Sequence, residues 1–168
     1  MDKKKPGFQV LRKENYPLVD QTDALDASTL TPDAVEGFTR MAEEGMYEGS
    51  TLKLVFTMPE LSVIHCWFRS GFPLPLHSHN ADCLYYVIAG EVRLGTEVIG
   101  EGDSFYVPSD VPYGYSAGPA GVELLEIRTK DKFNIKSHVK AIAGWDHAVH
   151  ATAKNHPKWG HEQRPARN

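Results

Sequence analysis

Hydrophobic and polar residues alternate in short runs along the middle of the chain, and glycine and proline separate these runs. Eight of the 14 glycines and five of the 11 prolines lie between residues 71 and 121. Such a density of helix breakers excludes a long helix there and is typical of short strands joined by tight turns. The predicted strands are Leu52–Thr57, Leu61–Arg69, Cys83–Ala89, Glu91–Leu94, Glu97–Gly100, Ser104–Val107, Tyr113–Ala117 and Val122–Thr129. Their length and spacing indicate a β-sandwich or barrel.

The regions on either side of these strands have a different pattern. Thr31 followed by Pro32 is a typical helix start, and apolar residues at helical spacing continue to Gly45, where we expect the helix to end. Apolar residues at positions 135, 139 and 142 predict a second, short helix. The polar stretch after it predicts an irregular C-terminal tail.

Composition and charge exclude several classes of protein. The 168 residues are 41% hydrophobic and 24% charged, as in one ordinary globular domain. Residues 1–133 carry 12 Lys/Arg against 20 Asp/Glu, and residues 134–168 carry six against two. An acidic body of this kind argues against nucleic-acid binding, and no apolar run approaches the roughly 20 residues of a membrane span. With two cysteines and no export signal, we expect a cytoplasmic protein without disulfides.

Two histidines form the clearest chemical signal. His77 and His79 are two residues apart, so in an extended chain their side chains lie on the same face. Two imidazoles that converge from one face can bind a first-row metal ion. By itself this spacing is weak evidence, and the surrounding residues decide what it means.

In that context the sequence resembles the cupin superfamily over about residues 61–129. The first cupin motif, G-x5-H-x-H-x3–4-E-x6-G, is matched by Gly71, His77, His79 and Gly90, and the second, G-x5-P-x-G-x2-H, by Gly102 and Pro108. The resemblance implies an all-β fold, an antiparallel jelly-roll barrel with a metal pocket in its mouth. We expect an N-terminal arm and helix over residues 1–49, the barrel over 50–133, and a short helix and basic tail over 134–168.

The sequence departs from the cupin motifs at three positions. Cys83 replaces the expected glutamate, Asp110 a glycine and Tyr113 the third histidine. Of the motif ligands, only His77 and His79 therefore carry over to this chain. A metal ion held by two imidazoles needs a third ligand from elsewhere, or the site is empty.

Three residues are candidates for the third ligand. Glu97 would complete the 2-His-1-carboxylate set of non-haem iron with His77 and His79, as in cupins resembling dihydroxyacetophenone dioxygenase. Cys83 could bind as a thiolate, which favours zinc, or pack as a small buried hydrophobe. Tyr113 could bind as a phenolate, or contact a ligand or line the pocket. We expect His77, His79 and Glu97 to hold a divalent metal, Fe(II) in preference to Zn.

Two further strands carry charged or aromatic candidates. His65, Trp67 and Arg69 share one face of their strand, and the pattern leaves open whether that face points inward. If it does, His65 could act as a proton donor. Glu123 and Glu126 lie on opposite faces of a later strand, so at most one of them can reach the pocket.

The sequence favours a metal-dependent cupin enzyme that acts on a small organic substrate. The most concrete form is a non-haem iron dioxygenase for a ketone or diketone, with Tyr113 or His65 handling the proton. A non-redox lyase or isomerase could use the same pocket. The alternative of a different class is a non-catalytic ligand-binding or sensor protein with a decayed metal site. Exposed strand edges, and the segment Phe8–Val19 without a partner in the motif region, predict a homodimer.

Overall fold

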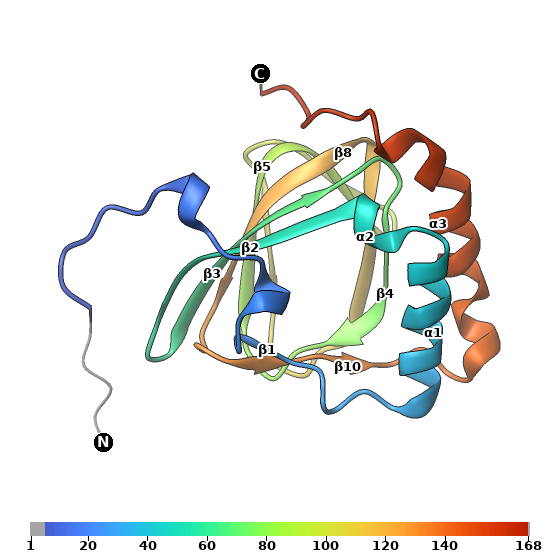
Figure 1. Ribbon diagram of the computed structural model, residues 1–168, viewed down its shortest axis with the longest axis horizontal. Helices are drawn as coiled ribbons and strands as arrows, with labels where there is room; N and C mark the ends of the chain where they lie inside the picture. Colours follow the sequence, from blue (N-terminus) through green and yellow to red (C-terminus); the bar gives the residue numbers. More distant parts are fainter. Residues whose placement is uncertain (1–5, 168) are drawn as a thin grey trace.

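The computed structural model, in which residues 6–167 are described, is built around one bent antiparallel sheet of eight strands (Figure 1). The order β10-β4-β8-β3-β2 runs across the sheet, and β5 lies along the other edge of β8 and also pairs with β6 and β7. These strands are β2 (Ser50–Met58), β3 (Leu61–Phe68), β4 (Pro73–Ser78), β5 (Cys83–Leu94), β6 (Glu97–Ile99), β7 (Ser104–Val107), β8 (Tyr113–Arg128) and β10 (Lys136–Ser137). A mostly β architecture with an antiparallel main sheet is confirmed. Pairing among the described residues leaves β2 and β10 at edges, so a closed barrel is not shown.

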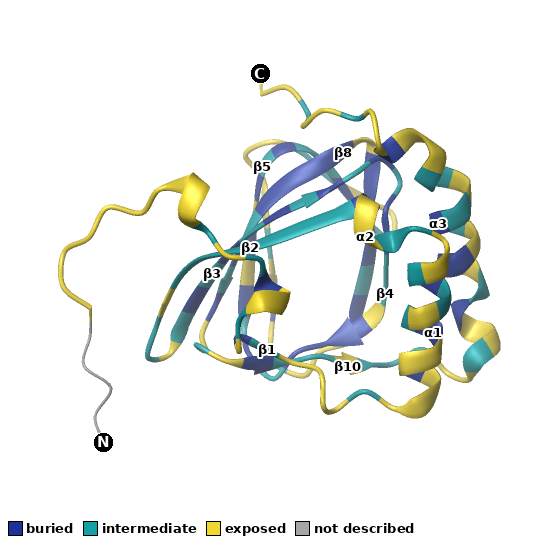
Figure 2. Cartoon of the chain, in the orientation of Figure 1, coloured by how far each residue is buried: buried dark blue, intermediate teal, exposed yellow. Residues whose placement is uncertain are grey.

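Alternation along the strands separates the core from the surface. Ile64, Cys66 and Phe68 of β3 are buried, while the residues between them are partly exposed. The same period of two continues on β5 up to Gly90 and on β8 over residues 113–117 and 124–128 (Figure 2). One face of the sheet therefore supplies the apolar interior, as this periodicity predicts.

Two predicted turns are instead parts of long strands. β5 continues through Gly90, and β8 continues through residues 118–121, where the register of pairing shifts. Gly90 has a φ of 75°, and a Cβ there would lie 2.2 Å from the carbonyl oxygen of Gly121. These glycines allow two strands to approach closely at a bulge, so they do not mark chain reversals.

The prolines of β4 concealed this strand in the sequence. Proline has no N–H for the ladder, and pairing with β8 is irregular between Leu74 and His77. The remaining pairs still hold the strand in the sheet, and they place His77 opposite Tyr113. This register positions the histidine motif.

The N-terminal helix α1 (Pro32–Glu43) forms as predicted. The Thr31 hydroxyl accepts a hydrogen bond from the N–H of Ala34, and Gly45 has a left-handed φ of 92°. Three short elements also belong to this half of the chain: η1 (Lys13–Asn15), η2 (Val19–Gln21) and α2 (Met46–Gly49). A parallel pair joins β1 (Leu25–Asp26) to β9 (Phe133–Asn134).

The prediction for the C-terminal segment is wrong in its helix positions. Residues near 135 form β9 and β10, and the helices lie later, at η3 (Ile142–Trp145) and α3 (Asp146–Trp159). Trp145 and Trp159 are both fully buried, and Trp145 packs between α1 and α3 in a second apolar cluster. Burial of these two rings stabilises a helix whose own sequence is mostly polar. Within residues 6–167, no helix is both long and apolar enough to cross a bilayer.

The contact between α1 and Trp145 gives a stability test. A Cβ on Gly37 would lie 2.0 Å from the Trp145 ring, so Gly37→Ala should lower the free energy of unfolding by about 1–3 kcal/mol despite alanine's better helix propensity. Gly160→Ala is the control, because a Cβ there meets no atom of residues 6–167 within 4 Å. Urea unfolding should leave this control within about 0.5 kcal/mol of the wild type. Equal stability of the two variants would contradict the packing described.

Candidate functional site

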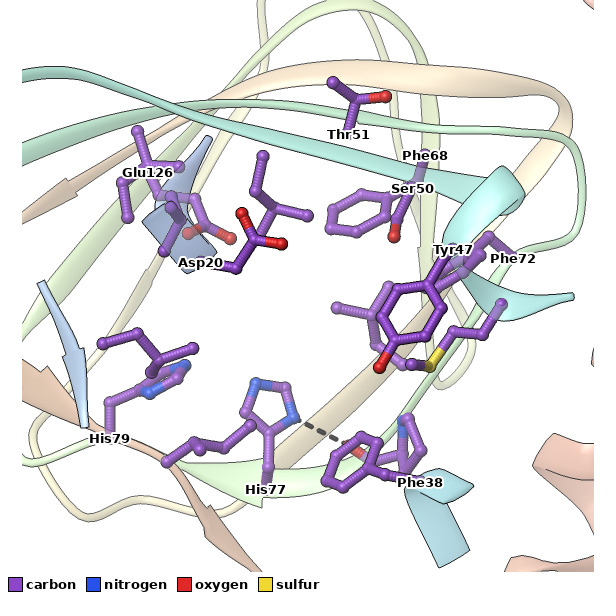
Figure 3. A pocket seen from close by; sticks show the side chains of 18 of the residues that line it. Asp20, Phe38, Tyr47, Ser50, Thr51, Phe68, Phe72, His77, His79 and Glu126 are labelled. Atoms are coloured by element: carbon purple, nitrogen blue, oxygen red, sulfur yellow. Dashed lines mark hydrogen bonds between the residues drawn. The ribbon is translucent and has the colours of Figure 1, made fainter. Parts of the chain in front are cut away.

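A cavity of about 600 Å³ lies between the inner face of the sheet and the N-terminal segment (Figure 3). Most of its lining is apolar, with Leu18, Phe38, Met41, Met46 and Tyr47 from the N-terminal segment and Leu52, Ile64, Phe68, Phe72 and Leu74 from the sheet and the turn before β4. Its polar lining includes His77, His79, Glu126, Arg128 and Asp20. The cavity is large enough for a small organic molecule.

Both motif histidines line the cavity, as their spacing predicts. His77 belongs to β4 and His79 follows it directly, and each is 7% exposed. Their ring centroids are 5.0 Å apart. His79 Nδ1 lies 2.5 Å from the main-chain oxygen of Asn134, and His77 Nδ1 lies 2.7 Å from that of Pro75. Since a carbonyl can only accept, both imidazoles carry their proton on Nδ1 and present Nε2 as an acceptor.

A chain of hydrogen bonds connects His77 to a buried arginine. The Tyr113 hydroxyl lies 3.0 Å from His77 Nε2, the Tyr85 hydroxyl contacts that of Tyr113, and Arg128 Nη2 lies 3.5 Å from the Tyr85 oxygen. An arginine cannot accept and the Pro75 carbonyl cannot donate, so every bond in the chain points from Arg128 towards Pro75. Nε2 of His77 is therefore occupied by Tyr113.

Burial controls the charges at this end of the cavity. It lowers the pKa of His77, and together with the nearby Arg128 and His77 it lowers the pKa of His79 to about 2. Burial also raises the pKa of Tyr85 and of Tyr113 above the ordinary value. Both imidazoles and both phenols are thus neutral at physiological pH.

Glu126 and Arg128 are site residues that the sequence did not single out as a pair. They lie two apart on the inner face of β8, are 4% and 2% exposed, and form an ion pair with Glu126 Oε2 2.5 Å from Arg128 Nη1. The Arg128 guanidinium also lies 4.1 Å from the centre of the Phe133 ring. The sequence does contain a signal for this pair. Leu124, Glu126 and Arg128 are each two residues apart, so in a strand the two charged side chains share the inward face of Leu124.

The structure does not bring Glu97 to the histidines. Glu97 is exposed, pairs with Leu94 at the end of the β5–β6 hairpin, and is not part of the cavity lining. Cys83 and Tyr113 are also absent from the lining, and burial raises the pKa of the Cys83 thiol to about 12. The expected set of His77, His79 and Glu97 is therefore not assembled.

These residues test whether the chain can hold the metal ion that the cupin resemblance implies. Among residues 6–167 there is no group of three or more His, Cys, Asp and Glu side chains placed to hold one. Tyr113 occupies Nε2 of His77, and the Arg128 cation lies at the same end of the cavity. The donor set does not fit a metal ion held by this chain.

His65 lies on the other face of the sheet. Its Nε2 is 2.7 Å from Glu123 Oε1, and the same carboxylate pairs with Arg164 of the C-terminal tail. Ile64, the neighbour of His65, points inward and lines the cavity, so alternation turns His65 outward. The proposed role of His65 as a proton donor to a ligand in the cavity is not supported by this position.

Comparison with known proteins identifies the fold. No family model matches the sequence, and no curated protein matches it. Among solved structures, the polyketide cyclase RemF from Streptomyces resistomycificus is 15% identical, covers 63% of this chain and 82% of its own, and has a TM-score of 0.53. An RmlC-like cupin from Shewanella frigidimarina is 22% identical, covers 71% of this chain and 94% of its own, and has a TM-score of 0.46. KdgF from Halomonas sp. is 26% identical, covers 49% of this chain and 82% of its own, and has a TM-score of 0.43. The chain has the cupin fold, as its motifs indicate.

The neutral histidines predict how stability depends on pH. Their pKa values are lower in the native state than the ordinary 6.5, so the unfolded chain binds protons first as the pH falls. Between pH 6.5 and 5.5 the free energy of unfolding should therefore fall by about 1 kcal/mol for each of the two histidines. His79→Asn, which keeps a donor for the Asn134 carbonyl, should remove about half of this loss in urea unfolding. The exposed His147→Asn is the control and should retain the wild-type dependence.

The position of the Tyr113 hydroxyl predicts a gain of metal binding. Tyr113→Phe should free Nε2 of His77 beside that of His79 and tighten binding of Co(II) at least about tenfold, measured by its visible absorption. Tyr115→Phe is the matched control, because the Tyr115 hydroxyl is buried and has no hydrogen-bond partner among the residues that the structure describes. Unchanged Co(II) affinity in Tyr113→Phe would show that the hydroxyl does not block the site.

Proposed function

We propose that this cupin binds a small, uncharged and largely apolar organic molecule that carries a hydroxyl group. The observation that carries the proposal is the cavity itself, which is apolar over most of its lining and has hydrogen-bond acceptors at one end. Of the functions expected from the sequence, this is the non-catalytic ligand-binding alternative.

The apolar lining favours a flat hydrocarbon body. Phe38, Phe68 and Phe72 line the cavity, and the Phe68 and Phe72 rings are stacked 5.2 Å apart. Aromatic side chains of this kind bind planar rings through offset or edge contacts. A volume of about 600 Å³ accommodates two fused rings.

The polar end favours a hydrogen-bond donor on the ligand. His79 presents Nε2 as an acceptor, and the carboxylates of Glu126 and Asp20 point into the cavity (Figure 3). Arg128 is paired with Glu126 and with Tyr85. Two carboxylates against one guanidinium disfavour an anionic ligand, whereas an alcohol, phenol or enol can donate to these acceptors.

The iron dioxygenase expected from the sequence is the second candidate. One observation favours it: both histidines donate Nδ1–H to a carbonyl, an arrangement that commonly orients metal-binding imidazoles. The lack of a third ligand among residues 6–167 counts against it. A non-redox lyase or isomerase would require proton transfer at His79 or Glu126.

Three naphthalene derivatives test the ligand class. Calorimetric titration should show that 2-naphthol binds at least about tenfold more tightly than 2-naphthoate or 2-methoxynaphthalene, because only the naphthol is both uncharged and a donor. Ser50→Phe places a ring in the cavity lining and should abolish binding. Thr57→Phe, on the same strand but exposed and outside the lining, should not change it.

The same preparation separates the two candidates. Iron near one atom per chain, in protein purified without added metal, would favour the dioxygenase. Equal affinity for the naphthol and the naphthoate would contradict the proposed ligand class. Binding that survives Ser50→Phe would place the ligand outside this cavity.

A further inference from the structure

A second cavity, of about 370 Å³, lies between the last turns of α3 and the strands β5 and β8. Its volume is within the range of pockets that hold small molecules. It shares no lining residue with the apolar cavity described above. We call it the basic cleft, and its charged and hydroxyl-bearing lining residues are Ser70, Arg93, Ser116, Lys154, Lys158 and Glu162.

Three cations from two distant parts of the chain line the basic cleft. Lys154 and Lys158 are four residues apart on α3, so they lie on the same face of the helix. Arg93 comes from β5 and is paired with Ser116 of β8, and such cross-strand partners share one face of the sheet. α3 packs beside β4 (Figure 1), and this packing brings its two lysines to the same cavity as Arg93.

Negative charge in the basic cleft does not balance these cations. The carboxylate in its lining, Glu162, accepts hydrogen bonds from the N–H of Ser70 at 2.8 Å and from the Ser70 hydroxyl. Glu91, which lies outside the lining, accepts from Arg93 Nε and Nη2 at 3.1 and 3.0 Å. Lys154 has no ion pair or hydrogen bond with any residue that the structure describes. The lining therefore keeps an excess of positive charge that the described residues do not neutralise.

The stability of α3 does not explain this arrangement. Two like charges four residues apart on a helix repel each other. A lysine in the last turn interacts favourably with the negative end of the helix, and this accounts for Lys158. Lys154 lies a full turn earlier and lines the same cavity. Its position therefore favours an anionic ligand in the basic cleft.

The number of donors in the basic cleft favours a phosphate group. A phosphate monoester carries about −1.5 to −2 charges at pH 7 and has three acceptor oxygens, so it can bind Arg93, Lys154 and Lys158 together. The Ser116 hydroxyl is a further donor. A carboxylate has one charge and two oxygens, so it matches these donors less well. We infer that the basic cleft binds the phosphate group of a small molecule, at a site separate from the apolar cavity.

Calorimetric titration of the full chain, in a buffer without phosphate, tests the site. Inorganic phosphate and glycerol phosphate should bind with dissociation constants below about 1 mM, and acetate should bind at least about tenfold more weakly. The double variant Lys154→Gln, Lys158→Gln should weaken phosphate binding at least about tenfold. Lys130→Gln, Lys140→Gln is the matched control, because it removes the same charge at exposed positions outside the lining. Tighter binding of glycerol phosphate than of phosphate would identify a phosphate monoester as the ligand, and equal binding would identify free phosphate.

Two further variants place the phosphate within the molecule. Glu162→Gln removes the negative charge of the lining but keeps an oxygen for Ser70, so it should tighten phosphate binding about threefold. Ser50→Phe, which fills the apolar cavity, should leave phosphate binding unchanged. Thermal unfolding verifies that each variant is folded. Absence of binding at about 20 mM phosphate would overturn the proposal. So would an equal loss in the two double lysine variants, or weaker binding in Glu162→Gln.

Discussion

The hydrogen-bond chain from Arg128 to the Pro75 carbonyl is the constraint on which the cavity depends. It joins three strands, because Arg128 and Tyr113 belong to β8, Tyr85 to β5, and His77 to β4. One end can only donate and the other can only accept, so a single arrangement of protons satisfies every member. That arrangement keeps His77 neutral with its Nε2 engaged. A change at any member would leave a buried polar group unpaired, which is costly in an apolar interior.

The same constraint explains how the chain departs from the cupin motif. Tyr113 stands where the motif has its third histidine, and its hydroxyl bonds to the first one. Cys83 stands where the motif has glutamate, and it is a buried thiol. Both substitutions replace a metal ligand by a group that stays neutral when buried. The polar end of the cavity is consequently organised by hydrogen bonds and one ion pair.

The two faces of the sheet separate two kinds of interaction. Inward residues enclose the cavity, while outward residues of β3 and β8 contact the C-terminal tail. Arg164 of the C-terminal tail pairs with Glu123, and its guanidinium lies 5.4 Å from the Trp67 ring. The tail therefore docks on its own sheet.

The sequence by itself determined the strand alternation, the start of α1, and the placement of His77 and His79 on one face. These features depend on residues close together in the chain, such as an i, i+2 pair or a capping threonine. Only the tertiary structure decided that Glu126 and not Glu97 lines the cavity, and that His65 points outward. It also decided the position of α3, because the tryptophans at its two ends, Trp145 and Trp159, are buried against residues far away in the sequence, Phe38 and Phe72. Periodicity shows which residues share a face, but which face lies inside depends on how strands far apart in sequence pair.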